Sequence, residues 1–169
     1  MFKLSQLIIT SIFSALLTFE LTLRAEEHPL VGVNLVGVNY PPLPEKIAPI
    51  SGWLIKAPYA IEKVSIQGKK LLLLSRLIER DSQGSPFFEV VNVLSLPPFN
   101  PETEEIAEGS SCSVNGQNDP NVVVIIKSED RDTQFLTQAR QAWRVEGEKF
   151  NEINPTDHQF KCENSAFGF

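Results

Sequence analysis

The fold prediction depends most on residues 122–146, which read VVVIIKSEDRDTQFLTQARQAWRVE. The first five residues of this stretch are all β-branched, and such a run is typical of a buried strand. Asp130 and Asp132 then favour the start of a helix, because their side chains accept hydrogen bonds from free backbone N–H groups and match the positive end of the helix dipole. The stretch therefore predicts a strand followed by a helix.

Apolar residues after these two aspartates recur at the spacing of one helix face, namely Phe135, Leu136, Ala139, Ala142 and Trp143. The residues expected on the solvent side are Gln134, Gln138, Arg140 and Gln141. Gly147 then predicts a turn between short strands at 143–146 and 149–153. The expected local fold is a βαββ unit.

Two cysteines, Cys112 and Cys162, flank this unit and are 50 residues apart. In an oxidising compartment an isolated even pair predicts a disulfide. A loop of that length would destabilise the unfolded chain by about 4 kcal/mol on the chain-entropy model. Two alternatives stay open at this point: two buried thiols, or a partial metal site that also uses His158.

The chain begins with features of an export signal. Lys3 precedes an apolar run over residues 4–19, and Ala25 supplies a small residue for cleavage. Cleavage after residue 25 would remove Lys3, Arg24 and Glu20 and take the net charge from −6 to −7. The alternative is an uncleaved N-terminal anchor. Either way we expect the rest of the chain outside the cytoplasm, in a periplasm, a thylakoid lumen or secreted, without a stable membrane span after cleavage.

Between this signal peptide and residue 53, the Pro/Gly-rich segment 26–52 predicts an extended arm, because its prolines prevent regular helix. Residues 64–66, 71–78 and 87–94 predict strands, joined by a Gln67-Gly68 turn and a loop dense in turn residues.

The expected fold class is α+β: a small, mainly antiparallel sheet, one principal amphipathic helix, and a C-terminal βαββ unit closed by the disulfide. The single domain, 53–169, comprises a hairpin half 53–96, an acidic surface connection 97–111 and a disulfide-closed half 112–162.

Several short motifs resemble a family of uncharacterised exported cyanobacterial proteins with a paired-cysteine C-terminal region. The motifs are Gly52-Trp-Leu-Ile55, Cys112-Ser-Val-Asn-Gly116, Asp119-Pro120, Ala142-Trp-Arg144, Phe150 and Cys162-Glu-Asn164, so the resemblance covers residues 52–169. It implies the compartment and the paired cysteines, and it carries over no catalytic residue.

The sequence contains no recognisable catalytic, nucleotide-binding or metal-binding motif, and we predict no cofactor. His28 lies in the arm, and His158 is expected on a surface loop. A weak candidate for a cation site consists of oxygen-bearing residues at alternate positions, Asn115, Gln117, Asp119 and Asn121. The acidic balance opposes nucleic-acid binding, which needs clustered basic residues.

Four aromatic residues, Trp53, Phe87, Phe88 and Phe99, are candidates for an interaction surface. Phe87 and Phe88 are neighbours on an expected strand, so their rings point to opposite faces of the sheet. The expected function is that of an exported accessory protein without catalytic activity, which binds another protein or an envelope component. The alternative is a small exported hydrolase whose carboxylates the sequence does not identify.

Overall fold

The computed structural model describes residues 34–128 and 132–168, and residues 34–169 form one compact unit. The predicted signal peptide and the first part of the predicted arm lie outside the described residues. The described part is built from strands: 56% of the described residues are in strands and 5% are helical, and no described helix reaches seven residues. The strands form three antiparallel sheets, which we call A, B and C.

Sheet A contains five strands in the order β1-β5-β4-β3-β2. Their bounds are Asn39–Tyr40 (β1), Ala48–Leu54 (β2), Tyr59–Ile66 (β3), Lys69–Arg80 (β4) and Pro86–Ser95 (β5). The two predicted hairpins are confirmed, because β3 pairs with β4 and β4 pairs with β5. Gln67 and Gly68 make the first turn with positive φ angles of 52° and 79°, a backbone conformation that glycine adopts without strain.

Sheet B has the order β12-β11-β9-β6, and sheet C has the order β10-β13-β7-β8. Sheet B consists of Glu104–Glu108 (β6), Val122–Lys127 (β9), Ala139–Glu146 (β11) and Lys149–Ile153 (β12). Sheet C consists of Cys112–Val114 (β7), Gln117–Asn118 (β8), Phe135–Leu136 (β10) and Phe160–Glu163 (β13). Two short 3₁₀ turns, Gly109–Ser111 and Pro155–Asp157, complete the described elements.

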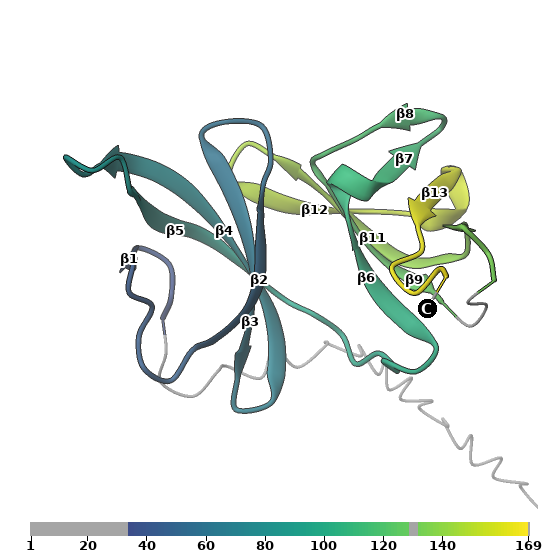
Figure 1. Cartoon of the computed structure of the whole chain (residues 1–169), viewed down its shortest axis with the longest axis horizontal. Coiled ribbons are helices and arrows are strands. Elements are labelled where there is room, and N and C mark those ends of the chain that lie inside the picture. Colours follow the sequence, from purple (N-terminus) through teal and green to yellow (C-terminus); the bar gives the residue numbers. More distant parts are fainter. Residues whose placement is uncertain (1–33, 129–131, 169) are drawn as a thin grey trace, which may run out of the picture. The chain divides into compact units, whose positions relative to one another are not determined.

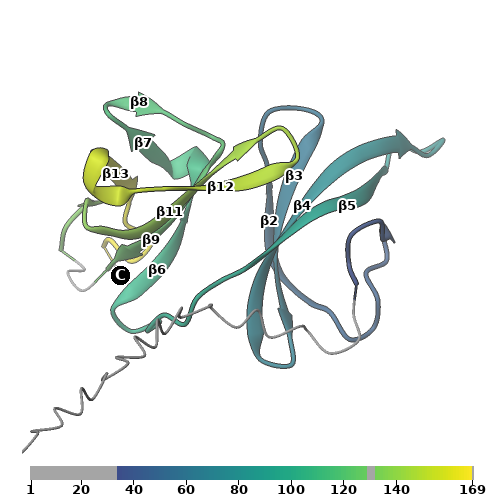
Figure 2. The same ribbon diagram turned by 180° about the vertical axis from the view of Figure 1, so that it is seen from behind.

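The disulfide is present between Cys112 on β7 and Cys162 on β13, which lie directly opposite each other in sheet C. Both cysteines are buried, with exposed fractions of 2% and 0%. They belong to a core between sheets B and C that also contains Val124 and Ala142. Figures 1 and 2 show the strands of sheet C beside one face of sheet B. The covalent link therefore lies inside this core.

The predicted helix, and with it the α+β class and the βαββ unit, is wrong. Phe135 and Leu136 form β10, while Ala139, Ala142 and Trp143 belong to β11. Sheet B is covered on both faces: Ala142 packs in the core against sheet C, and Trp143 packs with Leu72 and Leu74 of sheet A. Neighbouring residues on a strand point to opposite faces, so two adjacent buried residues on β11 imitate the spacing of a helical stripe.

Other strand predictions hold. Val122–Lys127 is the buried strand β9, and strands β11 and β12 meet at the turn containing Gly147. The segment 97–111, expected to be a surface connection, instead contributes β6, whose Ile106 and Ala107 pair with β9. The described part of the chain contains no helix long and apolar enough to cross a membrane.

Candidate functional site

Residues 41–47, which connect β1 to β2, cross one face of sheet A. We call this face the arm face. Glu62 and Ser75 point to this face, because they alternate along their strands with residues that pack on sheet B. Tyr40 and Phe88 lie on it too, directly opposite each other on β1 and β5. The rings of Tyr40 and Phe88 stack with their centroids 5.8 Å apart. Ile47, from the same segment, is buried with 5% exposure. The segment therefore packs onto the sheet by apolar contacts.

A pocket of about 450 Å³ lies between this segment, the arm face and the end of the β4–β5 hairpin. Its walls are mostly apolar and include Leu43, Ile47, Phe88 and the rings of Pro41, Pro49 and Pro86. Tyr40, Glu62 and Ser85 supply its polar groups. An apolar pocket of a few hundred Å³ with a small number of polar groups is typical of sites for small ligands.

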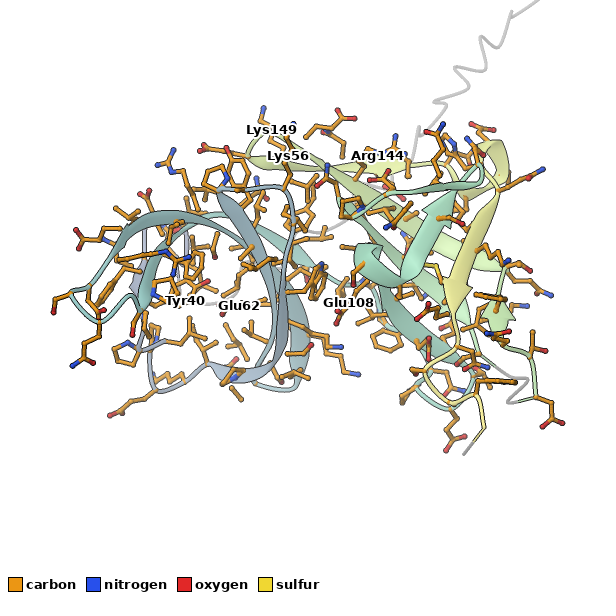
Figure 3. The ribbon with its side chains drawn as sticks, turned by 45° about the horizontal axis from the view of Figure 1, so that its top comes forward. Tyr40, Lys56, Glu62, Glu108, Arg144 and Lys149 are labelled. Carbon is orange, nitrogen blue, oxygen red and sulfur yellow. A yellow bond between two sulfur atoms is a disulfide. The ribbon has the colours of Figure 1, made fainter. Side chains whose placement is uncertain are left out.

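The polar end of the pocket is formed by Tyr40 and Glu62 (Figure 3). Tyr40 and Ser75 are 4% and 0% exposed; the Tyr40 hydroxyl lies near the Ser75 hydroxyl and the Glu62 carboxyl, but neither hydroxyl has the geometry of a full hydrogen bond to another described residue. A buried polar group without a partner costs about 1–3 kcal/mol. The Tyr40 hydroxyl, whose residue lines the pocket, would therefore gain from a ligand that supplies hydrogen bonds, whereas Ser75 lies behind the pocket lining.

The electrostatics of this end follow from its burial. Burial raises the pKa of the Glu62 carboxyl above its ordinary value, and the nearby Tyr40 hydroxyl partly opposes this shift. Burial also raises the pKa of the Tyr40 hydroxyl; the Ser75 hydroxyl opposes the shift and the charge of Glu62 adds to it. The ionised form of Glu62 is thus short of stabilising partners. A donor or a cation in the pocket would supply one.

Of the four aromatic residues predicted to form an interaction surface, the structure brings Phe88 alone to this pocket. Trp53 and Phe99 pack into the core between sheets A and B, and the Lys70 ammonium lies 4.2 Å from the centre of the Phe99 ring. Phe87 is half-buried and precedes Phe88 on β5.

The candidate cation ligands do not converge on one point. Asp119 accepts a hydrogen bond from Arg144 Nε at 2.9 Å and another from the Asn121 backbone N–H. The side-chain amide of Asn115 faces His158 Nδ1 at 3.2 Å. Gln117 is exposed on β8, and the Asn121 side-chain oxygen is buried without a partner. In the described part of the chain, no three His, Cys, Asp or Glu residues are placed to hold a metal ion.

A second, polar pocket of about 430 Å³ surrounds His158 and includes Thr156, Asp157 and Gln159. The polar groups here bond mainly to one another. Asn154 donates to Asp157 Oδ2 at 3.2 Å, and the backbone N–H of Gln159 donates to Asn115 Oδ1 at 2.9 Å. In the described part of the chain, no hydrogen bond joins Asp157 and His158, so Asp157 does not orient this histidine as a general base. His28 lies outside the described residues.

Sequence reasoning missed Tyr40, Glu62 and Ser75. The sequence does mark Glu62. On β3 it takes one position in a series of alternate residues, and the other members, Ala60, Val64 and Ile66, are all buried on the arm face. A carboxylate on the same face of a strand as buried apolar residues indicates a functional site better than a run of charges does. Burial of a charge is costly unless the charge has a role or a partner.

No protein-family model, no curated protein and no solved structure matches the chain. Function is therefore inferred from the geometry of its own residues.

Proposed function

We propose that the protein is a binding protein of an extracytoplasmic compartment, which holds a cationic hydrogen-bond donor attached to an apolar body. The disulfide is consistent with an oxidising compartment such as a periplasm, a thylakoid lumen or the exterior. The donor would belong to another protein or to an envelope component. The observation that carries the proposal is the half-buried Glu62 carboxylate beside the buried Tyr40 hydroxyl at the end of an apolar pocket.

Each part of the pocket favours such a ligand. An ammonium or guanidinium group would neutralise Glu62 and offer further donors to the hydroxyl oxygen of Tyr40. The stacked rings of Tyr40 and Phe88 suit a cation through their electron-rich faces. The prolines and Ile47 would cover the apolar body of the ligand. An anionic ligand would instead bring a second negative charge to Glu62.

The geometry supports binding better than hydrolysis. Hydrolases that use carboxylates need two of them facing one cleft. Among the described residues that line the apolar pocket, Glu62 is the sole carboxylate, and Asp157 is the sole one around the polar pocket.

Three probes of equal chain length test the proposal: n-hexylamine, n-hexanol and n-hexanoate. Each is titrated into the isotope-labelled mature protein at neutral pH, and binding is followed by amide chemical shifts of residues 40, 62 and 88. We expect hexylamine to bind more tightly than hexanol, and hexanoate to bind least. Glu62→Gln should remove the preference of the pocket for the amine. Glu102→Gln removes the same charge from an exposed turn and serves as the matched control.

The proposal fails if the three probes bind equally, or if hexanoate binds best. It also fails if Glu102→Gln weakens amine binding as much as Glu62→Gln does, because the effect would then arise from net charge and not from the pocket.

A further inference from the structure

Strand β2 is an edge of sheet A, since its outer side pairs with no other described strand. The N–H of Ile55 donates to the carbonyl of Tyr59, which lies just beyond the β2–β3 ladder. In an antiparallel pair, the N–H and C=O groups of every second residue point toward the partner strand. Ile55, Trp53 and Ser51 therefore direct these groups toward β3. The N–H and C=O groups of Gly52 and Leu54 therefore point to the outer edge.

The features that usually protect an edge are confined to the first part of β2. Pro49 and a bulge between Pro49 and Ser51 interrupt the ladder there, and both features discourage pairing. Residues 51–54 contain neither a charge nor a proline. Leu54 is 73% exposed and Ile50 is 48% exposed, so apolar side chains flank the short open stretch.

Gly52 lies directly opposite Glu62 and on the arm face. A Cβ atom at Gly52 would lie 3.1 Å from Glu62 Cγ and 3.3 Å from the Ile61 carbonyl oxygen, which is closer than ordinary contact. The glycine thus makes room for the Glu62 side chain, whose stem lies over the backbone of the edge strand. A strand added at the outer edge would lie about 10 Å from β3, two strand spacings away. A lysine or arginine on that strand, with its long stem, would cross the glycine and meet the Glu62 carboxylate between the two strands.

We propose that β2 binds an extended segment of another polypeptide by strand addition, with a lysine or arginine opposite Gly52 and an apolar residue two positions away on each side. This inference rests on the proposed function, because the basic side chain is the cationic donor that Glu62 receives. Main-chain hydrogen bonds to Gly52 and Leu54 supply affinity, and alternate side chains supply specificity.

Charge complementarity selects this occupant over a second copy of the chain. Strand β2 reads APISGWL and contains no basic residue, so an antiparallel β2–β2 pair would leave Glu62 without a cation. The net charge of −6 likewise opposes self-association and attracts a basic segment.

The probe is the peptide acetyl-Ser-Val-Thr-Lys-Thr-Val-Ser-amide, compared with the same peptide carrying glutamine in place of lysine. Two further peptides carry N-methyl groups on one or the other set of alternate residues, which removes those backbone donors. Binding to the mature protein is measured by titration, with the amide shifts of Gly52 and Leu54 as the local readout. The lysine peptide should bind about tenfold more tightly than the glutamine peptide. One of the two N-methylated peptides should lose binding while the other retains it.

Two pairs of variants complete the design. Glu62→Gln should abolish the preference for lysine over glutamine, whereas Glu102→Gln should keep it. Leu54→Ser should weaken binding, whereas Ile78→Ser, a similarly exposed apolar residue on β4 with 49% exposure, should not. None of these positions is a fully buried core residue, and an unchanged amide spectrum confirms that each variant folds.

Strand addition is overturned if the lysine peptide leaves Gly52 and Leu54 unshifted, or if both N-methylated peptides bind as well as the parent. It is also overturned if the mature protein alone forms a concentration-dependent dimer that shifts the same two amides. If hexylamine still binds through Glu62 in any of these cases, the pocket function stands and the strand addition alone is rejected. If neither hexylamine nor the peptide binds, both proposals fail.

Discussion

Two buried polar side chains, Asn164 after β13 of sheet C and Ser75 in sheet A, differ in whether their hydrogen bonds are satisfied. Asn164, in the turn that follows β13, is 7% exposed; its side chain donates to the Thr133 carbonyl at 2.8 Å and accepts from the Ala166 N–H at 3.0 Å. Ser75, in sheet A, is 0% exposed and its hydroxyl has no partner among the described residues. Asn164 is therefore explained by folding alone, whereas Ser75 and its neighbour Tyr40 are not.

The position of the unsatisfied group matters as well: Tyr40 lines the apolar pocket, whereas Asn121 Oδ1 and Trp53 Nε1 are also buried without a partner among the described residues but line neither pocket. A polar group that satisfies its own hydrogen bonds stabilises the local fold, as Asn164 does for the turn after β13. A polar group held unsatisfied next to an apolar pocket lowers stability, and such a cost is typical of binding sites. We therefore expect substitutions in the disulfide-closed region to change stability, and substitutions around Glu62 to change binding.

The largest expected effect concerns the disulfide. Replacing both Cys112 and Cys162 by alanine should lower the free energy of unfolding by about 4 kcal/mol, because the link closes a loop of 50 residues. Chemical denaturation measures this change, and the wild-type protein under reducing conditions serves as the control.

Amide hydrogen exchange then shows which strands lose stability in the double variant. Amides of β7 and β13 should exchange faster in the double variant, while amides of β3 and β4 should change least. An equal increase in both regions would show that the two regions unfold together and would weaken the contrast between them.

The next effect separates the ring of Tyr40 from its hydroxyl. Tyr40→Ala removes the stacking on Phe88 and leaves a cavity in the arm face, so it should cost about 3 kcal/mol of unfolding free energy. Tyr40→Phe retains the ring and removes a buried hydroxyl without a partner, so it should leave stability unchanged or raise it. If Tyr40→Phe instead destabilises the fold by more than about 1 kcal/mol, the hydroxyl has a structural partner. It would then not be available to a ligand in the apolar pocket.

Strands β4, β5, β9 and β12, with the last residues of β3 and β11, could be predicted from the sequence because their information is local. The Gln67-Gly68 turn, the turn residues after Arg80 and the β-branched run at 122–126 each specify a strand end or a strand without help from distant residues. The helix prediction failed because burial of β11 depends on two different partners. Sheet C covers Ala142 and sheet A covers Trp143, and neither contact can be read from residues 130–146.

The site was less predictable still, for a similar reason. Glu62, Ser75 and Tyr40 lie on β3, β4 and β1, and only the sheet order brings their side chains to one face. A search for motifs at fixed spacing cannot find such a group. The position of Glu62 in a buried apolar row was visible once β3 was assigned, but the pocket also needs the segment that contains Ile47.

The smallest expected effect is the dependence of stability on pH at Glu62. Burial raises the pKa of this carboxyl in the folded protein above its ordinary value of 4.5, so the folded state holds the proton more tightly than the unfolded state does. The stabilisation from this proton is complete below pH 4.5 and is lost as the pH rises through the raised pKa. Glu62→Gln does not titrate. The stability of this variant relative to wild type should therefore increase with pH across that interval and then level off.

Thermal unfolding of both proteins from pH 4 to pH 8 measures the effect, and Glu102→Gln controls for the loss of one charge. Hexylamine should reverse the trend, because a bound cation stabilises the ionised carboxylate and makes wild type the more stable protein at neutral pH. If the difference between Glu62→Gln and wild type stays constant with pH, Glu62 is solvated like a surface residue. The contrast between the two regions would then rest on the hydroxyls of Tyr40 and Ser75 alone.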